Sequence, residues 1–336
     1  MSKCRIAVLL IVTLSSIPAF ASEIEVGAVN GVLFAEIPSD GEIHPVIVKA
    51  QVLLDRANIS PGEINGKISA NFDEMLRAFT VSHGLPADTQ WSEAFWSKLT
   101  STVIGPALTE YVVTREDAKG PFIKLPPKIE DMTGLKALGY ASLREALAEK
   151  FHMSEELLAE LNPDAPFAQA GERIVVANVM SDQKLTPVAR VDVDKERRTV
   201  KAYSRNGELV AFFPASVGSE EKPSPSGTLK VVLIESDPSY HYNPKYHFKE
   251  VDTQKPFDLN PGPNNPLGST WIALSQPSYG IHGTPEPALV GNSESHGCVR
   301  VTNWDAQRLA RMLSKGVPVN FIEKRRDEPD FQFAAY

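Results

Sequence analysis

The apolar residues of this 336-residue chain change their spacing along the sequence, and this change limits the folds open to it. Up to about residue 100 they recur every three or four positions, which is typical of amphipathic helices. From about residue 187 they alternate with polar residues, which is typical of half-buried strands. The chain is also too long for one ordinary core, so we predict several domains of different class.

Residues 44–100 predict three short helices, separated by the turn pairs Pro61-Gly62 and Asn65-Gly66. The apolar faces contain Val48, Val52 and Leu53, then Phe72, Leu76 and Phe79, and last Trp91, Phe95, Trp96 and Leu99. Through AQVLLDRANISPGEING and LRAFTVSHGL the segment resembles the three-helix peptidoglycan-binding module. A plain three-helix core is the alternative.

Residues 107–178 predict a strand, two short helices and a second strand, with Ser154 as the N-cap of the second helix. With FHMSEELLAELNP and AGERIVV, this order resembles a lysin-motif domain, a family that binds glycans containing N-acetylglucosamine. The stretch between Thr114 and Tyr140 is much longer than the corresponding connection of that family. We therefore expect a small α+β module, and whether it binds glycans does not follow from the sequence.

Residues 187–323 predict a mostly β domain, resembling a β-sandwich, with one packed helix. Alternating segments flank Asn206-Gly207, a signal for a two-residue hairpin, and GTLKVVLI, TWIAL and PVNFI add further strands. Only NWDAQRLARMLSKG is helical in pattern, with Trp304, Leu309 and Leu313 on one face and Gly316 as its stop. Residues 324–336 are expected to be a solvated tail.

Residues 1–21 are typical of a cleaved secretory signal peptide. Lys3 and Arg5 precede a short apolar stretch, and Ala19-Phe20-Ala21 forms a small-x-small cleavage site. That stretch is too short to cross a bilayer with these flanks, although a retained membrane helix is the alternative. We therefore expect the mature protein outside the cytoplasm.

Cleavage after residue 21 would change both the charge and the cysteine content. It removes Lys3 and Arg5 and no acidic residue, so the formal net charge would go from -8 to -10. An acidic chain without a basic block argues against nucleic acid as a partner. Cleavage also removes Cys4 and leaves Cys298 alone, which excludes an intramolecular disulfide and marks Cys298 as a reactive candidate rather than an inert core thiol.

The stretch IHGTPEPALVGNSESHGCVR, residues 281–300, places His282, His296 and Cys298 within seventeen residues. Zinc accepts such ligands, but two of them lie only two residues apart, so we expect no metal. A nucleophile with its base is favoured instead. Lowering a thiol pKa from about 8.5 to about 6 requires about 3.4 kcal/mol, which a nearby imidazolium supplies. Gly297 lets the backbone turn sharply before the thiol.

With SPSGT and NPLGSTWIAL upstream, this stretch resembles the catalytic domain of the L,D-transpeptidases of bacterial cell walls, over residues 188–322. The resemblance implies that Cys298 is the nucleophile that forms an acyl-enzyme and that His282 is the general base. It also implies that the main-chain carbonyl of Gly283 orients the imidazole. No cofactor is implied.

The same resemblance assigns supporting roles around the thiol. Ser295, His296 and Gly297 would shape the oxyanion region, and Arg300 would hold a substrate carboxylate, although many family members have Asn at that position. The segment SYHYNPKYHFK, residues 239–249, is either a solvated loop or a substrate wall. Its candidate substrate-binding residues are Tyr240, Tyr242 and His247.

The implied function is that of a periplasmic enzyme that acts on peptidoglycan and is a target of carbapenems. It would attack a tetrapeptide stem and form a 3–3 crosslink, or attach an outer-membrane or wall-anchored protein to the glycan-linked stems. With water as acceptor, the same site would be an L,D-carboxypeptidase or endopeptidase. A non-catalytic wall-binding protein is the remaining alternative, and it would have kept the Cys, the His pair and the glycines by chance.

Overall fold

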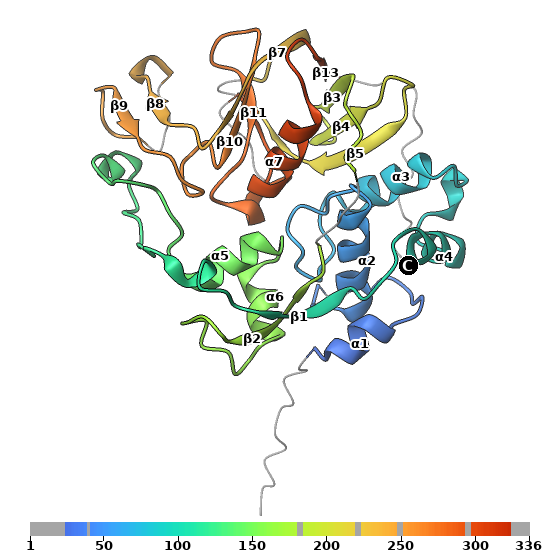
Figure 1. Cartoon of the computed structure of the whole chain (residues 1–336). Coiled ribbons are helices and arrows are strands. Elements are labelled where there is room, and N and C mark those ends of the chain that lie inside the picture. The colour runs from blue at the N-terminus through green and yellow to red at the C-terminus, as the bar shows by residue number, and fades with distance from the viewer. Residues whose placement is uncertain are drawn as a thin grey trace, which may run out of the picture.

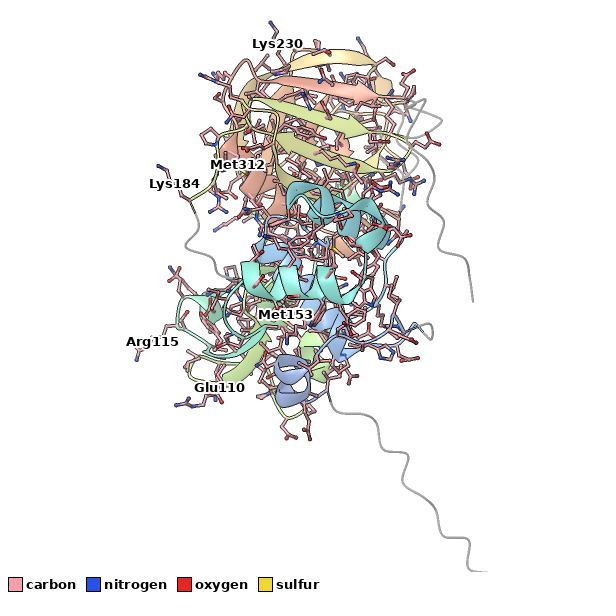
Figure 2. All side chains as sticks on the ribbon, turned by 90° about the vertical axis from the view of Figure 1, so that its right-hand side faces the viewer. Glu110, Arg115, Met153, Lys184, Lys230 and Met312 are labelled. Atoms are coloured by element: carbon pink, nitrogen blue, oxygen red, sulfur yellow. The ribbon has the colours of Figure 1, made fainter. Side chains whose placement is uncertain are left out.

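The computed structural model describes residues 24–38, 41–179, 184–218, 223–246, 251–292 and 297–323. A strand-rich part lies on one side of the molecule and a mainly helical part on the other (Figure 1). The side view separates the same two parts, with Lys230 and Met312 in the first and Glu110 and Met153 in the second (Figure 2). Within the described residues, no helix is both long and apolar enough to span a membrane.

The strand-rich part is one mixed sheet in the order β5-β4-β3-β13-β7-β10-β11-β12-β6. Its members are β3 (Arg190–Asp194), β4 (Thr199–Tyr203), β5 (Leu209–Pro214), β6 (Ser216–Val217), β7 (Gly227–Ser236), β10 (Thr270–Leu274), β11 (Gly280–His282), β12 (Val299–Arg300) and β13 (Pro318–Ile322). The long strand β7 pairs with β13 through its first four residues and with β10 through the rest. This staggered pairing lets the sheet curve nearly into a barrel around one apolar core.

The mostly β domain with one packed helix is thereby confirmed, whereas the expected resemblance to a β-sandwich is not, because the strands named above pair edge to edge in one curved sheet. The helix is α7 (Asn303–Met312), which begins after Thr302, whose side chain accepts a hydrogen bond from the Asp305 amide. The β4–β5 hairpin differs from the expected two-residue turn, since residues 204–208 connect its strands. The Ser204 amide donates to the Glu208 carbonyl at 2.9 Å, and a β-bulge follows Ala202. The hairpin loop is therefore longer than the pair Asn206-Gly207.

The first helical segment, residues 44–100, contains the three expected helices α2 (Pro45–Arg56), α3 (Phe72–Ser82) and α4 (Glu93–Thr102). Ser92 caps α4 by accepting a hydrogen bond from the Phe95 amide, so Trp91 lies before this helix and not on it. A short additional helix, α1 (Val26–Gly31), packs beside α2. Phe212 of β5 is fully buried in the core of this segment. The apolar core of the three helices therefore extends to the edge of the large sheet.

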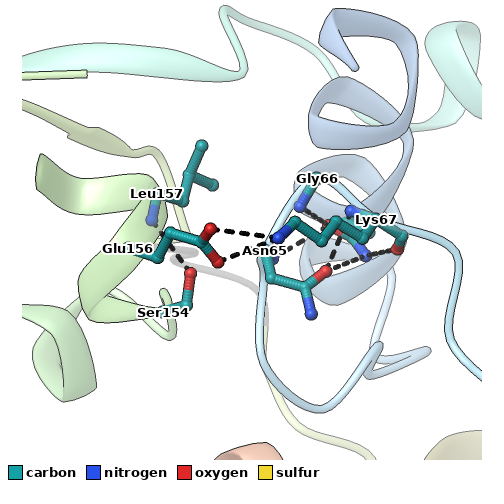
Figure 3. A network of polar contacts seen from close by, with 7 residues as sticks. Asn65, Gly66, Lys67, Ser154, Glu156 and Leu157 are labelled. Carbon is teal, nitrogen blue, oxygen red and sulfur yellow. Dashed lines mark hydrogen bonds and ion pairs between the residues drawn. The ribbon is translucent and has the colours of Figure 1, made fainter. Parts of the chain in front are cut away.

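The second segment, residues 107–178, has the expected order of β1 (Leu108–Val112), α5 (Leu143–Lys150), α6 (Glu155–Glu160) and β2 (Arg173–Ala177). Its two strands pair antiparallel. Ser154 caps α6 as predicted, because its hydroxyl accepts a hydrogen bond from the Leu157 amide at 3.0 Å. Figure 3 shows this cap beside the Lys67–Glu156 ion pair, which joins α6 to the loop that follows α2.

Residues 115–139, which we call the insertion, connect β1 to α5 and contain the short 3₁₀ helices η2 (Asp117–Lys119) and η3 (Ile129–Met132). The insertion extends away from the rest of its segment toward the two-stranded sheet of β8 (Tyr240–Tyr242) and β9 (Phe257–Leu259) (Figure 1). The short helices η4 (Pro244–Tyr246) and η5 (Pro287–Leu289) complete the elements of the strand-rich part.

Candidate active site

The two residues at the centre of the sequence motif are brought together by the neighbouring strands β11 and β12. These strands run parallel, with Ile281 opposite Val299 and His282 opposite Arg300. The Val301 amide donates a hydrogen bond to the His282 carbonyl at 2.9 Å, which continues the pairing. Since Cys298 immediately precedes β12, its backbone is held beside the strand that carries His282.

His282 is 5% exposed, and its ring lies close to that of Trp271 on the adjacent strand, with centroids 5.6 Å apart. Its Nδ1 is 2.7 Å from the Gly283 carbonyl oxygen. A carbonyl only accepts hydrogen bonds, so Nδ1 carries the proton and Nε2 has the free lone pair of the neutral imidazole. This tautomer is the one a general base requires.

The imidazole of His282 is neutral near pH 7. Burial, and to a lesser degree the positive charge of Arg300, lowers its pKa to about 3, against the raising effect of the Gly283 hydrogen bond. His282 therefore does not supply the standing imidazolium that the sequence predicts beside the thiol. The buried ring instead removes a proton only when the thiol reacts, because desolvation disfavours its charged form.

Cys298 is partly exposed and carries a reduced thiol that is not part of a disulfide. Its Sγ lies 3.6 Å from the Ser278 carbonyl oxygen. The preceding residue, Gly297, has a φ of 90°, a conformation that glycine adopts without strain. The Ser224 hydroxyl donates to the Gly297 carbonyl at 3.0 Å and thereby fixes the peptide group that joins Gly297 to Cys298.

The side chain of Asn303, the first residue of α7, leaves no room for a side chain at position 283, which is therefore occupied by glycine. A Cβ on Gly283 would lie 2.2 Å from Asn303 Oδ1, and one on Gly268 would lie 2.0 Å from the same atom. Asn303 is 1% exposed, and its Oδ1 accepts a hydrogen bond from the Ser269 amide at 3.0 Å. Asn303 therefore packs directly against the residue whose carbonyl orients His282.

Asn303 is in turn held by the second segment. Its Nδ2 donates to Glu149 Oε1 at 2.8 Å and to the Pro263 carbonyl at 3.1 Å. Tyr140 donates its hydroxyl hydrogen to the other oxygen of Glu149 at 3.1 Å. Helix α5 thus contacts Asn303, and through it the backbone beside His282, by the side chain of Glu149.

Cys298, His282 and Arg300 line a cavity of about 610 Å³. Tyr240 also lines it, whereas the Tyr242 ring is 3% exposed and stacks on Phe257 at 4.8 Å. Its lining also includes Pro127, Ile129, Met132, Val251 and Trp271. The predicted site residues Ser295, His296 and His247 lie outside the described residues. Among the residues that are described, no group of three or more His, Cys, Asp or Glu is arranged to hold a metal ion.

Comparison with known proteins connects this geometry to a family. The family model of the L,D-transpeptidase catalytic domain matches residues 188–321. An L,D-transpeptidase of Fuscovulum blasticum is 30% identical over 129 residues, which cover 38% of this chain and 67% of that protein. The chain belongs to the L,D-transpeptidase family.

One further relative agrees with this assignment, and one solved structure is reported for comparison. The Bacillus licheniformis protein named L,D-transpeptidase YkuD is 28% identical over 178 residues, which cover 52% of this chain and 91% of that protein. A crystal structure of an Enterococcus faecium L,D-transpeptidase is 20% identical and has a TM-score of 0.31. That likeness covers 44% of this chain and 55% of the Enterococcus chain.

Several residues of this L,D-transpeptidase site were not singled out from the sequence. Trp271 lies in a predicted strand and Asn303 in a predicted helix, so the sequence gives each residue a structural role and no reason to place it at the site. Glu149 and the insertion gave no signal, because their contacts with the site span more than 100 residues of sequence. From the sequence, the long connection between Thr114 and Tyr140 is only a departure from the lysin-motif pattern that leaves glycan affinity open.

Proposed function

We propose that the chain is a periplasmic L,D-transpeptidase that acts on peptidoglycan tetrapeptide stems through an acyl-enzyme on Cys298. The observation that carries this proposal is a neutral, buried His282 whose Nδ1 donates to the Gly283 carbonyl, in the same cavity as the reduced Cys298 thiol. This is the arrangement of a nucleophile with an oriented base.

In the proposed reaction, His282 Nε2 takes the thiol proton while Cys298 Sγ attacks the carbonyl carbon of the third, diamino-acid residue of the stem. His282 then gives that proton to the departing amine, and the terminal D-Ala leaves. An amine of a second stem attacks the thioester, loses a proton to His282 and restores the thiol. The product is a 3–3 crosslink, and an amine on a wall-anchored protein would give an attached protein instead.

Gly297 and Arg300 have proposed supporting roles. Gly297 has a φ of 90°, and without a Cβ it would let a substrate carbonyl oxygen approach the Cys298 backbone amide, as an oxyanion region requires. Arg300 lines the cavity and is close enough to His282 to lower its pKa, so a substrate carboxylate at Arg300 would lie near the thiol. Ser295 and His296 are proposed to complete this region.

We assign the two preceding segments as wall-binding modules: residues 44–100 as peptidoglycan-binding and 107–178 as lysin-motif-like. The three-helix core supports the first assignment, and the strand, helix, helix, strand order supports the second. Cleavage of residues 1–21 as a signal peptide would place the protein in the periplasm, where its substrate lies.

Incubation of the purified protein with tetrapeptide-containing muropeptides, followed by mass analysis, tests the function. We expect dimers with a 3–3 bond, and none from a Cys298→Ala variant whose thermal unfolding matches that of the native chain. Tripeptide monomers alone would reassign the enzyme as a carboxypeptidase. Identical products from Cys298→Ala would overturn the mechanism.

A further inference from the structure

The insertion forms one wall of the catalytic cavity. Pro127, Ile129 and Met132, which come from η3 and the residues just before it, line the same cavity as Cys298 and His282. Ile129 and Met132 are partly exposed, and Val251, which is 8% exposed, adds a further apolar side chain to the lining. A segment of the second N-terminal module therefore reaches the place where the substrate must lie.

The insertion is joined to the catalytic domain by hydrogen bonds between main-chain atoms. The Leu138 amide donates to the Pro261 carbonyl, and the Asn264 amide donates to the Leu138 carbonyl, both at 2.9 Å. Between them, a Cβ on Gly262 would lie 2.2 Å from the Leu138 oxygen, and Gly262 has a φ of 150°. This close backbone approach is possible only for glycine and fixes the C-terminal end of the insertion.

Further contacts hold the insertion against the residues around β9. Asn260 Nδ2 donates to the Leu135 carbonyl at 2.7 Å, and the Asp252 amide donates to Glu130 Oε1 at 3.2 Å. The Lys128–Asp252 ion pair, at 2.9 Å, is more than half exposed on both sides and contributes little. The hydrogen bonds to Glu130, within η3, and to Leu135 and Leu138, after it, hold η3 beside the cavity.

We propose that Pro127, Ile129 and Met132 form a subsite that binds the aliphatic part of the stem peptide above Cys298. This inference rests on the proposed function, since it names the part of the substrate that the cavity selects. These three side chains have no hydrogen-bond donor, so they suit alanine methyls and the methylene chain of a diamino acid better than sugar hydroxyls. A cavity of about 610 Å³ has the size of pockets that enclose such ligands.

The subsite is tested by binding of a synthetic tetrapeptide stem to the full chain carrying Cys298→Ala, which separates binding from catalysis. Added Ile129→Ser and Met132→Ser together should raise the Kd about tenfold, as loss of buried apolar contact predicts. The matched control is Ile123→Ser, which removes an isoleucine of the same insertion that is 39% exposed and is not among the cavity-lining residues. Its Kd should stay within about twofold of that of the parent chain.

A blocking experiment covers the case in which the double variant fails to fold. Met132→Cys in the Cys298→Ala chain provides one thiol at the wall, and a bulky maleimide on that thiol should abolish tetrapeptide binding. An unchanged Kd in either experiment, an equal loss in Ile123→Ser, or no tetrapeptide binding by the Cys298→Ala chain would overturn the subsite.

The same variants separate the subsite from the proposed function. If the enzyme with Cys298 turns over muropeptides with an unchanged KM after both serine substitutions, the subsite is wrong and the function stands. If tetrapeptide binding depends on the wall but no muropeptide is ever converted, the subsite stands and the transpeptidase function is wrong.

Discussion

Two carboxylates at the contact between the N-terminal segments and the catalytic domain have opposite environments. Asp55 of α2 is fully buried and bound by Arg308 Nη2 at 2.7 Å and by His152 Nδ1 at 3.0 Å, and these partners hold its pKa well below the usual range against its burial. Glu149 of α5 meets the neutral donors Asn303 and Tyr140, and burial raises its pKa to about 7.

The difference separates a structural joint from a contact that positions the active site. Asp55 joins the first segment to α7 through a buried ion pair, and Ser60 adds a hydrogen bond from its hydroxyl to Asp305 at 2.7 Å. Glu149 instead holds Asn303, which packs against Gly283 beside His282. The N-terminal part is therefore not a simple tether, and its two segments should respond differently to mutation.

The largest expected effect on stability is that of Asp55→Ala. It leaves the Arg308 guanidinium, 7% exposed, without its buried counter-charge, which should cost about 3–5 kcal/mol. Urea unfolding measures the loss, and folded Asp55→Ala protein should keep the native kcat. Glu110→Ala is the control, since its ion pair with Arg173 is about three-quarters exposed on both sides and should change stability by less than about 0.5 kcal/mol. Equal losses in the two variants would contradict the structural joint.

Glu149→Ala should affect catalysis more than stability. Removing the carboxylate leaves Asn303 Nδ2 with only the Pro263 carbonyl and loosens the contact with Gly283, so kcat should fall about tenfold or more while KM changes little. Stability should fall by about 1–3 kcal/mol. Steady-state kinetics on folded protein provide the measurement, and Glu149→Gln, which keeps one acceptor for Asn303, should recover part of kcat. A native kcat in Glu149→Ala would show that the Glu149–Asn303 contact does not position the active site.

The two carboxylates should contribute to stability with opposite dependence on pH. The raised pKa of Glu149 means that its contribution is present below its ordinary value of 4.5 and is lost as pH rises toward about 7, by at most about 3 kcal/mol. The lowered pKa of Asp55 means that its contribution is present above its ordinary value of 3.8 and is lost as pH falls.

Urea unfolding of the native chain, Glu149→Gln and Asp55→Asn between pH 3 and 8 measures these slopes. Relative to the native chain, Glu149→Gln should gain stability as pH rises from about 5 to 7, because the amide does not ionise. Asp55→Asn should show its largest deficit at neutral pH and a smaller one near pH 3. Parallel curves for all three proteins would contradict the assigned protonation states.

The smallest effect is expected for Lys128→Ala. Its exposed ion pair with Asp252 should contribute less than about 0.5 kcal/mol, because the backbone contacts at Leu138 hold the insertion in place. Thermal unfolding and the KM for tetrapeptide should both match the native values. A severalfold rise in KM would mean that the ion pair, and not the backbone, positions the cavity wall.

Local patterns predicted the elements, while pairings distant in sequence set their arrangement. Helix α7 and strands β7, β10 and β13 followed from apolar spacing, because each buries one face against the same core. The neighbouring placement of His282 and Cys298 followed from the motif. The neutral state of His282 did not, since its burial depends on the surrounding strands and on Trp271, 11 positions earlier in the chain.

The contacts that differ most from expectation involve the second segment. The sequence of α5 gave a reason for a helix but none for Glu149 to meet Asn303, 154 residues later. The long connection before Tyr140 was a departure from the lysin-motif pattern, and a sequence pattern does not reveal which surface an insertion contacts. Such pairings depend on how whole segments pack, not on local propensity.

Acyl transfer through Cys298 with His282 as base is tested by intact-protein mass analysis of the enzyme mixed with a disaccharide-tetrapeptide. We predict an adduct on Cys298 that equals the substrate minus D-Ala, no adduct in Cys298→Ala, and at least a hundredfold slower formation in His282→Ala. Release of D-Ala at the native rate by folded Cys298→Ala, or an adduct on any other residue, would rule out Cys298 as the nucleophile.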